Sequence, residues 1–129
     1  MMVIIVGAAR CLLIVTLLAA LPAKLLAATS TSDTLQADTP AQILNLANQA
    51  LATGGLSDLD KERILAKRGL AHEMLGQRND AVSDFNEVVA STVLAADERA
   101  IVLYDRGVTL DELGRTDDAI ADYTAALRF

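Results

Sequence analysis

Apolar residues recur every three or four positions from about residue 39 onwards, which is the spacing of one face of an α-helix. Five such stretches follow one another, separated by short segments that contain Gly, Ser or Asn. The pattern predicts helices over about 40–53, 57–75, 79–89, 95–113 and 117–129. No stretch of useful length alternates apolar and polar residues with the period of two that strands require. The sequence therefore predicts an all-α chain with short connections.

Capping residues mark the predicted helix ends. Thr39 precedes Pro40 and Gln42 with the spacing of a capping box, in which a side chain at each position bonds the backbone amide of the other. Ser57 and Asp60 have the same spacing. The predicted helices end at glycines, which readily adopt the left-handed backbone of a helix terminus: Gly54, Gly55, Gly76 and Gly114.

An apolar segment precedes the helical part. Residues 11–21 are almost unbroken hydrophobe, with Arg10 before them and small residues after them. This order is typical of a secretory signal peptide, so we predict a signal over 1–28, a flexible leader over 29–38 and export to the periplasm. The alternative is an uncleaved anchor in the inner membrane, because residues 1–21 are about long enough to cross a bilayer.

The charge balance narrows the choice of partners. Without residues 1–28 the chain loses Arg10 and Lys24 and keeps 9 basic against 17 acidic residues, a net charge of −8. Binding to nucleic acid or to an anionic membrane surface requires clustered Lys and Arg, and no basic stripe occurs. We therefore expect no nucleic-acid partner, and membrane contact only through residues 1–21 if they stay attached.

One eleven-residue phrase occurs twice in the chain. LGQRNDAVSDF begins at Leu75 and LGRTDDAIADY begins at Leu113, which is a period of 38 residues. Self-similarity at such a period indicates stacked supersecondary units. We predict a repeat domain over 39–129 that contains a degenerate half repeat over 39–56, a repeat over 57–95 and a repeat over 96–129.

The shared residues have expected mechanical roles. Gly69 and Gly107 fall in mid-helix, where Gly costs about 1 kcal/mol relative to Ala, so we expect close helix–helix approach there. We expect Ala81 and Ala119 to face these glycines, and Phe85 and Tyr123 to supply bulk between neighbouring helix pairs. Because Arg and Asp repeat together, we also expect two ion pairs within the hairpins: Arg68–Asp84 and Arg106–Asp122.

Candidate catalytic residues are few. His72 and Glu73 begin like a zinc-protease helix, but that motif needs a second His and the chain has one His. Asp80 with Asp84, and their counterparts one period later, are paired carboxylates whose recurrence argues against a unique active site. We predict a non-enzymatic chain without a metal, catalytic residue or cofactor.

The repeated positions resemble those of the tetratricopeptide repeat (TPR) family. The residues that carry the resemblance are Gly69, Gly76, Ala81 and Phe85, then Gly107, Gly114, Ala119 and Tyr123. The period of 38 is four residues longer than the 34 of that family. The resemblance implies a short right-handed α-solenoid of helix–turn–helix units, similar to repeats of exported or envelope-linked bacterial proteins.

The resemblance also implies a partner groove on the first helices of the units. Its expected residues are Arg63, Ala66, Leu70, Glu73, Met74, Ile101, Tyr104, Val108, Asp111 and Glu112. This set is apolar at its floor and acidic at one end, so we expect a protein or peptide partner with an apolar or basic segment. The predicted function is a protein-interaction module outside the cytoplasm; the alternative is a membrane-anchored structural subunit of a cell-envelope assembly. Self-association through the C-terminal end is a further expectation, because repeat units need neighbours to bury their apolar faces.

Overall fold

The computed structural model describes residues 39–129, which form five helices and no strand. These are α3 (Pro40–Thr53), α4 (Asp58–Met74), α5 (Arg78–Ala90), α6 (Ala96–Glu112) and α7 (Thr116–Ala126). The all-α prediction is confirmed for this part of the chain. The expected signal peptide (1–28) and leader (29–38) lie outside the described residues. Over 39–129, no helix combines the length and the hydrophobicity that a bilayer crossing needs.

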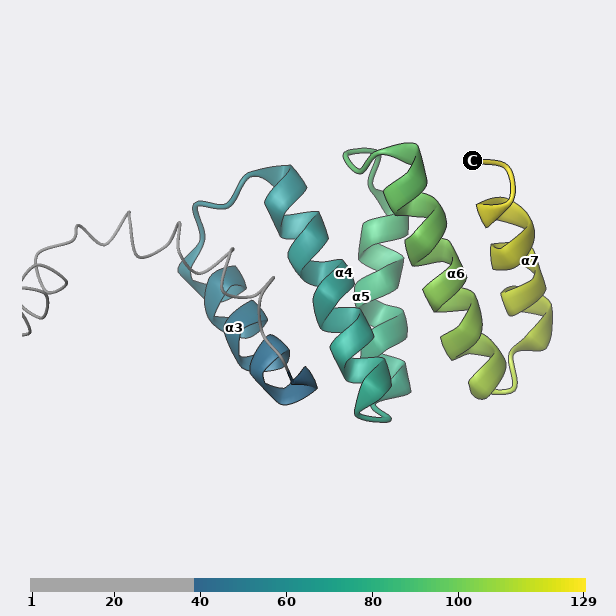
Figure 1. Cartoon of the computed structure of the whole chain (residues 1–129), viewed down its shortest axis with the longest axis horizontal. Helices are drawn as coiled ribbons and strands as arrows, with labels where there is room; N and C mark the ends of the chain where they lie inside the picture. Colours follow the sequence, from purple (N-terminus) through teal and green to yellow (C-terminus); the bar gives the residue numbers. More distant parts are fainter. Residues whose placement is uncertain (1–38) are drawn as a thin grey trace, which may run out of the picture.

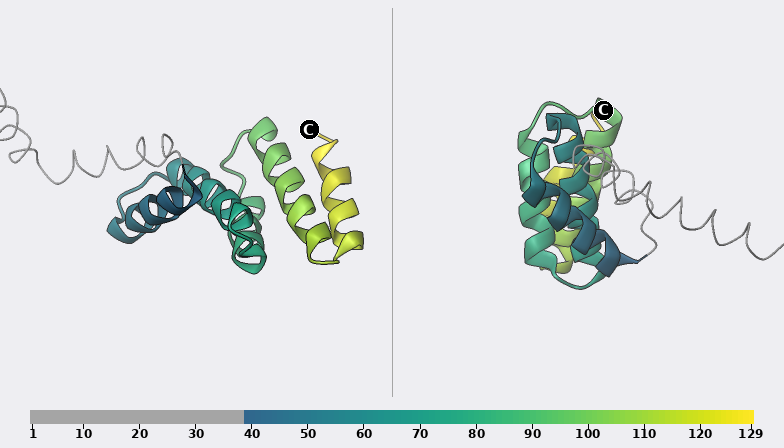
Figure 2. Two further views of the ribbon diagram at one scale, coloured as in Figure 1. Left: turned by 60° about the horizontal axis from the view of Figure 1, so that its bottom comes forward. Right: turned by 90° about the vertical axis from the view of Figure 1, so that its left-hand side faces the viewer.

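The helices follow one another in chain order along the long axis of the molecule (Figure 1). Each helix packs against its neighbours in sequence, and α4 also contacts α6, the next helix but one. The left-hand view in Figure 2 shows the same order of helices, and the right-hand view looks along the row, so the helices overlap there. The stack of helix–turn–helix units predicted from the repeated phrase is therefore present, with α3 as the half unit before two hairpins.

Local capping explains where the helices begin. Thr39 Oγ1 accepts a hydrogen bond from the Gln42 amide (3.3 Å), and Gln42 Oε1 accepts one from the Thr39 amide (3.1 Å), so the predicted capping box is confirmed. Ser57 Oγ likewise accepts from the Asp60 amide (3.1 Å). The third helix begins at Arg78, one residue before the predicted Asn79, and has no side-chain cap.

The two hairpin turns are built alike. Gly76 and Gly114 have φ of +74° and +76°. This left-handed backbone conformation is readily adopted by glycine and is unfavourable for residues with a Cβ atom. After α4, the Gly76 amide donates to the Glu73 carbonyl and the Gln77 amide to the His72 carbonyl, both at 2.8 Å. The turn after α6 repeats both bonds at 2.9 Å. These two hydrogen bonds satisfy backbone carbonyls that have no partner within the helix. The repeated Leu-Gly sequence therefore specifies the same turn conformation in both hairpins.

The core runs along the stack rather than around one centre. Its three groups of buried side chains are Ala47, Ala50 and Ile64 between α3 and α4; Leu65, Ala81, Phe85, Val88, Leu94 and Val102 in the middle; and Val82, Leu110 and Ala119 towards α7. The middle group draws on α4, α5, α6 and the connection before α6, so one hairpin buries its apolar face against the next.

The mid-helix glycines make room for aromatic rings. A Cβ atom added to Gly69 would lie 2.6 Å from the Phe85 ring, and one added to Gly107 would lie 2.6 Å from the Tyr123 ring. The aromatic ring of the same hairpin is therefore the nearest neighbour of each glycine, and the expectation that Ala81 and Ala119 face the glycines stays a prediction. Each glycine accepts the flat ring of its own hairpin, because only hydrogen atoms project there.

Alanine at Gly69 is expected to destabilise the chain by about 1–2 kcal/mol, because the cost of overpacking exceeds the helix-propensity gain of about 1 kcal/mol. Phe85 is fully buried and has no room to retreat. The matched variant Gly107→Ala should lose less stability, because the Tyr123 ring is only partly buried and can shift. Urea unfolding of both variants checks this order, and an equal or larger loss for Gly107→Ala would contradict it.

Two arginines join consecutive elements of the stack. Arg68 donates from Nε and Nη2 to the two carboxylate oxygens of Asp84 (2.8 and 2.6 Å), and Arg106 bonds Asp122 in the same way (2.7 and 2.6 Å). Both predicted ion pairs are confirmed. The bonded carboxylates are buried, at 5% and 6% exposure. A bidentate geometry at a buried acceptor fixes the two helices of each hairpin in one register.

Each arginine also reaches the preceding unit. Arg68 Nη1 donates to Asn48 Oδ1 of α3 and Arg106 Nη1 donates to Asn86 Oδ1 of α5, both at 2.9 Å. The asparagines are 38 residues apart, as are the arginines. Asn48 therefore occupies in α3 the place that Asn86 occupies in α5, which supports the interpretation of α3 as the second helix of an earlier unit.

Candidate functional site

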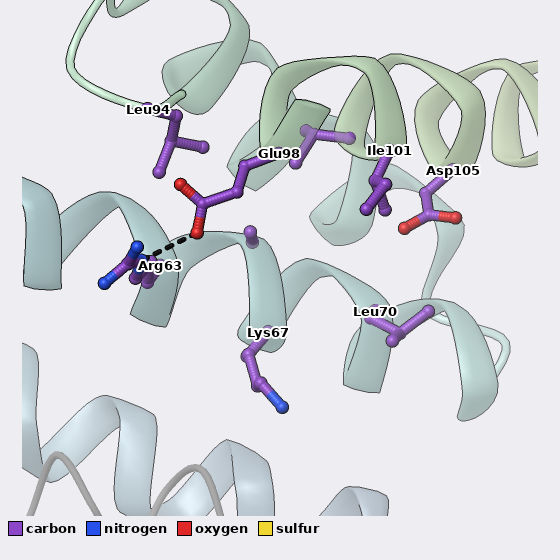
Figure 3. Close-up of a pocket in the computed structure, with 9 residues that line it drawn as sticks. Arg63, Lys67, Leu70, Leu94, Glu98, Ile101 and Asp105 are labelled. Carbon is purple, nitrogen blue, oxygen red and sulfur yellow. Dashed lines mark hydrogen bonds and ion pairs between the residues drawn. The ribbon is translucent and has the colours of Figure 1, made fainter. Parts of the chain in front are cut away.

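An open groove of about 370 Å³ lies between α4 and α6. Its lining residues are Arg63, Ala66, Lys67 and Leu70 of α4, Leu94 of the preceding connection, and Glu98, Ile101, Val102 and Asp105 of α6 (Figure 3). The volume lies within the range of sites that hold small ligands or side chains.

The floor of the groove is aliphatic. Leu94 and Val102 are buried in the core beneath it, and Ala66 packs on the same core. Leu70 and Ile101 stay 39% and 62% exposed, on the opposite walls that α4 and α6 provide. Exposed aliphatic side chains over an apolar floor favour burial of an apolar partner, which would remove their surface from water.

An ion pair spans one end of the groove. Arg63 Nε donates to Glu98 Oε1 at 2.8 Å, as the dashed line in Figure 3 shows. Glu98 Oε2 also accepts from the Ala95 amide at 3.3 Å, so this carboxylate both begins α6 and holds Arg63. The Lys67 stem lines the groove, while its ammonium group is directed away from Glu98 and Asp105 (Figure 3). Arg63 and Glu98 therefore neutralise each other, whereas Lys67 has no ion-pair partner among residues 39–129.

The other end carries excess negative charge. Burial raises the pKa of Asp105, and this carboxylate has no ion-pair partner among residues 39–129. Burial, followed by repulsion from Asp105 and Glu112, raises the pKa of Glu73. The nearby cation is Arg78, whose Nε already donates to Glu112 at 2.7 Å. Arg78 thus interacts with both Glu112 and Glu73, and an added cation would relieve the repulsion that Asp105 and Glu112 exert on Glu73.

The ten predicted groove residues do not all meet in one place. Four line the groove: Arg63, Ala66, Leu70 and Ile101. Glu73 and Glu112 belong to the acidic end through their charges, whereas Met74, Tyr104, Val108 and Asp111 lie outside the lining. Tyr104 packs instead against Tyr123, with ring centroids 5.6 Å apart. The reason is geometric: the equivalents of Ala66 and Leu70 in α6 could line a second groove only with another first helix beyond them.

Five lining residues were not predicted: Lys67, Leu94, Glu98, Val102 and Asp105. A signal for two of them exists, because Lys67 and Asp105 occupy equivalent places one period apart, next to the predicted positions. Leu94 lies in the connection between α5 and α6, where no helical periodicity points to a buried side chain.

The one histidine of the chain lies at the first hairpin turn. His72 Nδ1 lies 2.6 Å from Gln77 Oε1, and its Nε2 lies 3.9 Å from Asp84 Oδ2, so the imidazole is held at the hairpin turn. In this part of the chain, no three His, Cys, Asp or Glu side chains come together as metal ligands would.

No protein-family model matches this sequence, and no curated protein or solved structure is significantly similar to it.

Proposed function

We propose that this chain is a non-enzymatic binding module of the TPR type. In this proposal the groove between α4 and α6 holds a peptide or protein segment in which an apolar stretch is followed by a basic residue. The observation that carries it is the juxtaposition of an aliphatic groove with the carboxylate of Asp105, which has no ion-pair partner among residues 39–129. The repeated glycines and aromatic rings support the family, because each ring fits against the glycine of its own hairpin.

The apolar N-terminal segment supports action outside the cytoplasm, as an exported periplasmic chain. The alternative, a structural subunit held in the inner membrane by residues 1–21, rests on the same segment. N-terminal sequencing of the chain recovered from the exported fraction separates the two. A mature end near residue 28 supports export, and an intact Met1 supports the anchor.

Binding of designed peptides tests the groove. The probe is a short labelled peptide of leucines followed by two lysines, and its match carries two glutamates in place of the lysines. We expect the lysine peptide to bind the full chain up to about fivefold more tightly, because one favourable charge pair contributes up to about 1 kcal/mol. Fluorescence anisotropy measures both affinities at low salt.

Three variants make the test specific. Ile101→Asp should weaken the lysine peptide at least about tenfold by placing a charge on the apolar wall. Asp105→Asn should reduce the preference for lysine over glutamate while retaining the apolar contribution. Ile120→Asp on α7 alters an exposed aliphatic residue outside the groove and should change neither affinity. Equal binding of both peptides, or no effect of Ile101→Asp, would exclude the proposed site.

A further inference from the structure

The outer face of α7 presents a row of side chains with no covering helix in the described part of the chain. Ile120 and Leu127 are 56% and 88% exposed, and Thr124 is exposed between them. Leu127 directly follows the last residue of α7, and its amide still donates to the Tyr123 carbonyl at 3.2 Å, so the spacing of four and three residues places all three side chains on one face. Large aliphatic side chains at such exposure are unusual enough on one face to call for an explanation.

The same face occurs one period earlier on α5, and there it is covered. Val82, Asn86 and Val89 are the residues 38 positions before Ile120, Thr124 and Leu127. Val82 is buried against Leu110 of α6, Val89 packs on the middle core group, and Asn86 accepts the hydrogen bond from Arg106. Helix α6 therefore covers this face of α5, and Arg106 of α6 makes the polar contact with it.

The face occurs a third time on α3, with the same kind of cover. Leu51 packs with Ile64 of α4, and Asn48 accepts from Arg68 of α4. Both covering helices share one signature, an aliphatic residue followed four positions later by arginine: Ile64 with Arg68, and Val102 with Arg106. The chain thus shows twice which chemistry fits this face.

Thr124 can serve as the polar acceptor that Asn48 and Asn86 provide. Its Oγ1 donates its hydrogen to the Ile120 carbonyl at 2.7 Å. That bond uses the only donor of the hydroxyl and leaves oxygen lone pairs to accept a hydrogen bond. An arginine approaching over the helix, as Arg106 approaches Asn86, would find this acceptor between two apolar contacts.

We propose that the outer face of α7 binds an amphipathic helix of another polypeptide, which carries an aliphatic residue and an arginine four positions later. A second copy of this chain fits less well. Its own arginines of this type, Arg68 and Arg106, are engaged with Asp84 and Asp122 and with the asparagines of the preceding helix. Paired α7 helices would bury aliphatic surface and leave Thr124 without a donor.

The chain itself supplies the probe, a labelled peptide with the sequence of residues 95–113, which contains α6 and its signature. We expect this peptide to bind the full chain, and the matched peptide with Arg106→Ala to bind about fivefold more weakly, the effect of one hydrogen bond from a charged group. Ile120→Asp or Leu127→Asp in the full chain should weaken binding at least about tenfold. Both altered residues are exposed, so circular dichroism should show a folded chain for at least one of them.

The groove variant Ile101→Asp is the matched control and should leave binding of the peptide unchanged, which also separates this test from that of the proposed groove. Three results would overturn the proposal. The first is no binding at millimolar peptide. The second is binding that survives both α7 substitutions, which would mean that the peptide enters elsewhere. The third is a dimer in sedimentation equilibrium that Ile120→Asp dissociates, which would make a second copy the occupant.

Discussion

Replacing Phe85 by alanine is expected to lower the free energy of unfolding by about 3–5 kcal/mol. Phe85 is the largest fully buried side chain in the described part of the chain, and it contacts both its own hairpin and the next one. Its ring lies against Gly69, where no side chain could move in to fill the cavity. Small domains are stable by only about 5–15 kcal/mol, so the variant should be close to unfolding at room temperature.

Urea unfolding followed by circular dichroism measures this loss. Phe85→Leu is the control, because it keeps much of the volume and should cost markedly less than alanine. Tyr123→Ala, the equivalent change one unit later, should also cost less, since the Tyr123 ring is only partly buried. A loss below about 1 kcal/mol for Phe85→Ala would mean that the hairpins do not share the interior described above.

Replacing Arg68 by alanine is expected to lower the free energy of unfolding by about 2–3 kcal/mol. Breaking a fully buried ion pair costs about 3–5 kcal/mol because the remaining charge is left unpaired. The Arg68 side chain keeps 24% of its exposure, so water can reach the site and reduces the loss. The same change also removes the bond to Asn48 and so loosens α3.

A double-mutant cycle with Asp84→Ala measures the coupling between the two residues. The double variant should be less destabilised than the sum of the single variants, because it leaves no buried carboxylate behind. The control pair is Lys61 and Glu87, which bond at 2.7 Å but are 47% and 52% exposed. Alanine at Lys61 should change stability little. Strict additivity at Arg68 and Asp84 would show that the bidentate pair does not stabilise the fold.

Several parts of the fold could be predicted from the sequence because they depend on local chemistry. The capping box at Thr39 and the glycine turns at Gly76 and Gly114 follow from backbone requirements that a few neighbouring residues reveal. The pairing of Arg68 with Asp84 could be predicted because both residues recur with the same period. Periodicity therefore revealed contacts between helices as well as the helices themselves.

Contacts that depend on three-dimensional approach could not be predicted from spacing. The nearest neighbours of Gly69 and Gly107 are the rings of Phe85 and Tyr123, and which side chain lies nearest to a glycine depends on helix rotation, which a spacing pattern does not give. The roles of Asn48 and Asn86 could not be predicted although these residues too are 38 positions apart, because polar residues are common on exposed helix faces and their spacing alone indicates no contact. Leu94 lies in a connection without periodicity.

Only part of the groove lining was predicted, because this too depends on how the helices are placed in space. Positions on α4 that face α6 line it, whereas the equivalent positions on α6, such as Tyr104 and Val108, have no further first helix opposite them within residues 39–129. A resemblance that treats all units alike assigns both sets to one surface. The structure distinguishes them, because a groove of this kind needs two walls.

The hydrogen bonds that join an asparagine, an arginine and an aspartate across each junction also indicate how a further repeat unit could be added to the molecule. Residues 58–95 contain one arginine, one aspartate and one asparagine of this link, and they span a single period. A duplicate inserted after Ala95 would offer its arginine to Asn86 and its own asparagine to Arg106. The junction between α5 and the duplicate would then repeat the arginine–asparagine bond of the two existing junctions, so the polar link would continue without a break through the enlarged array.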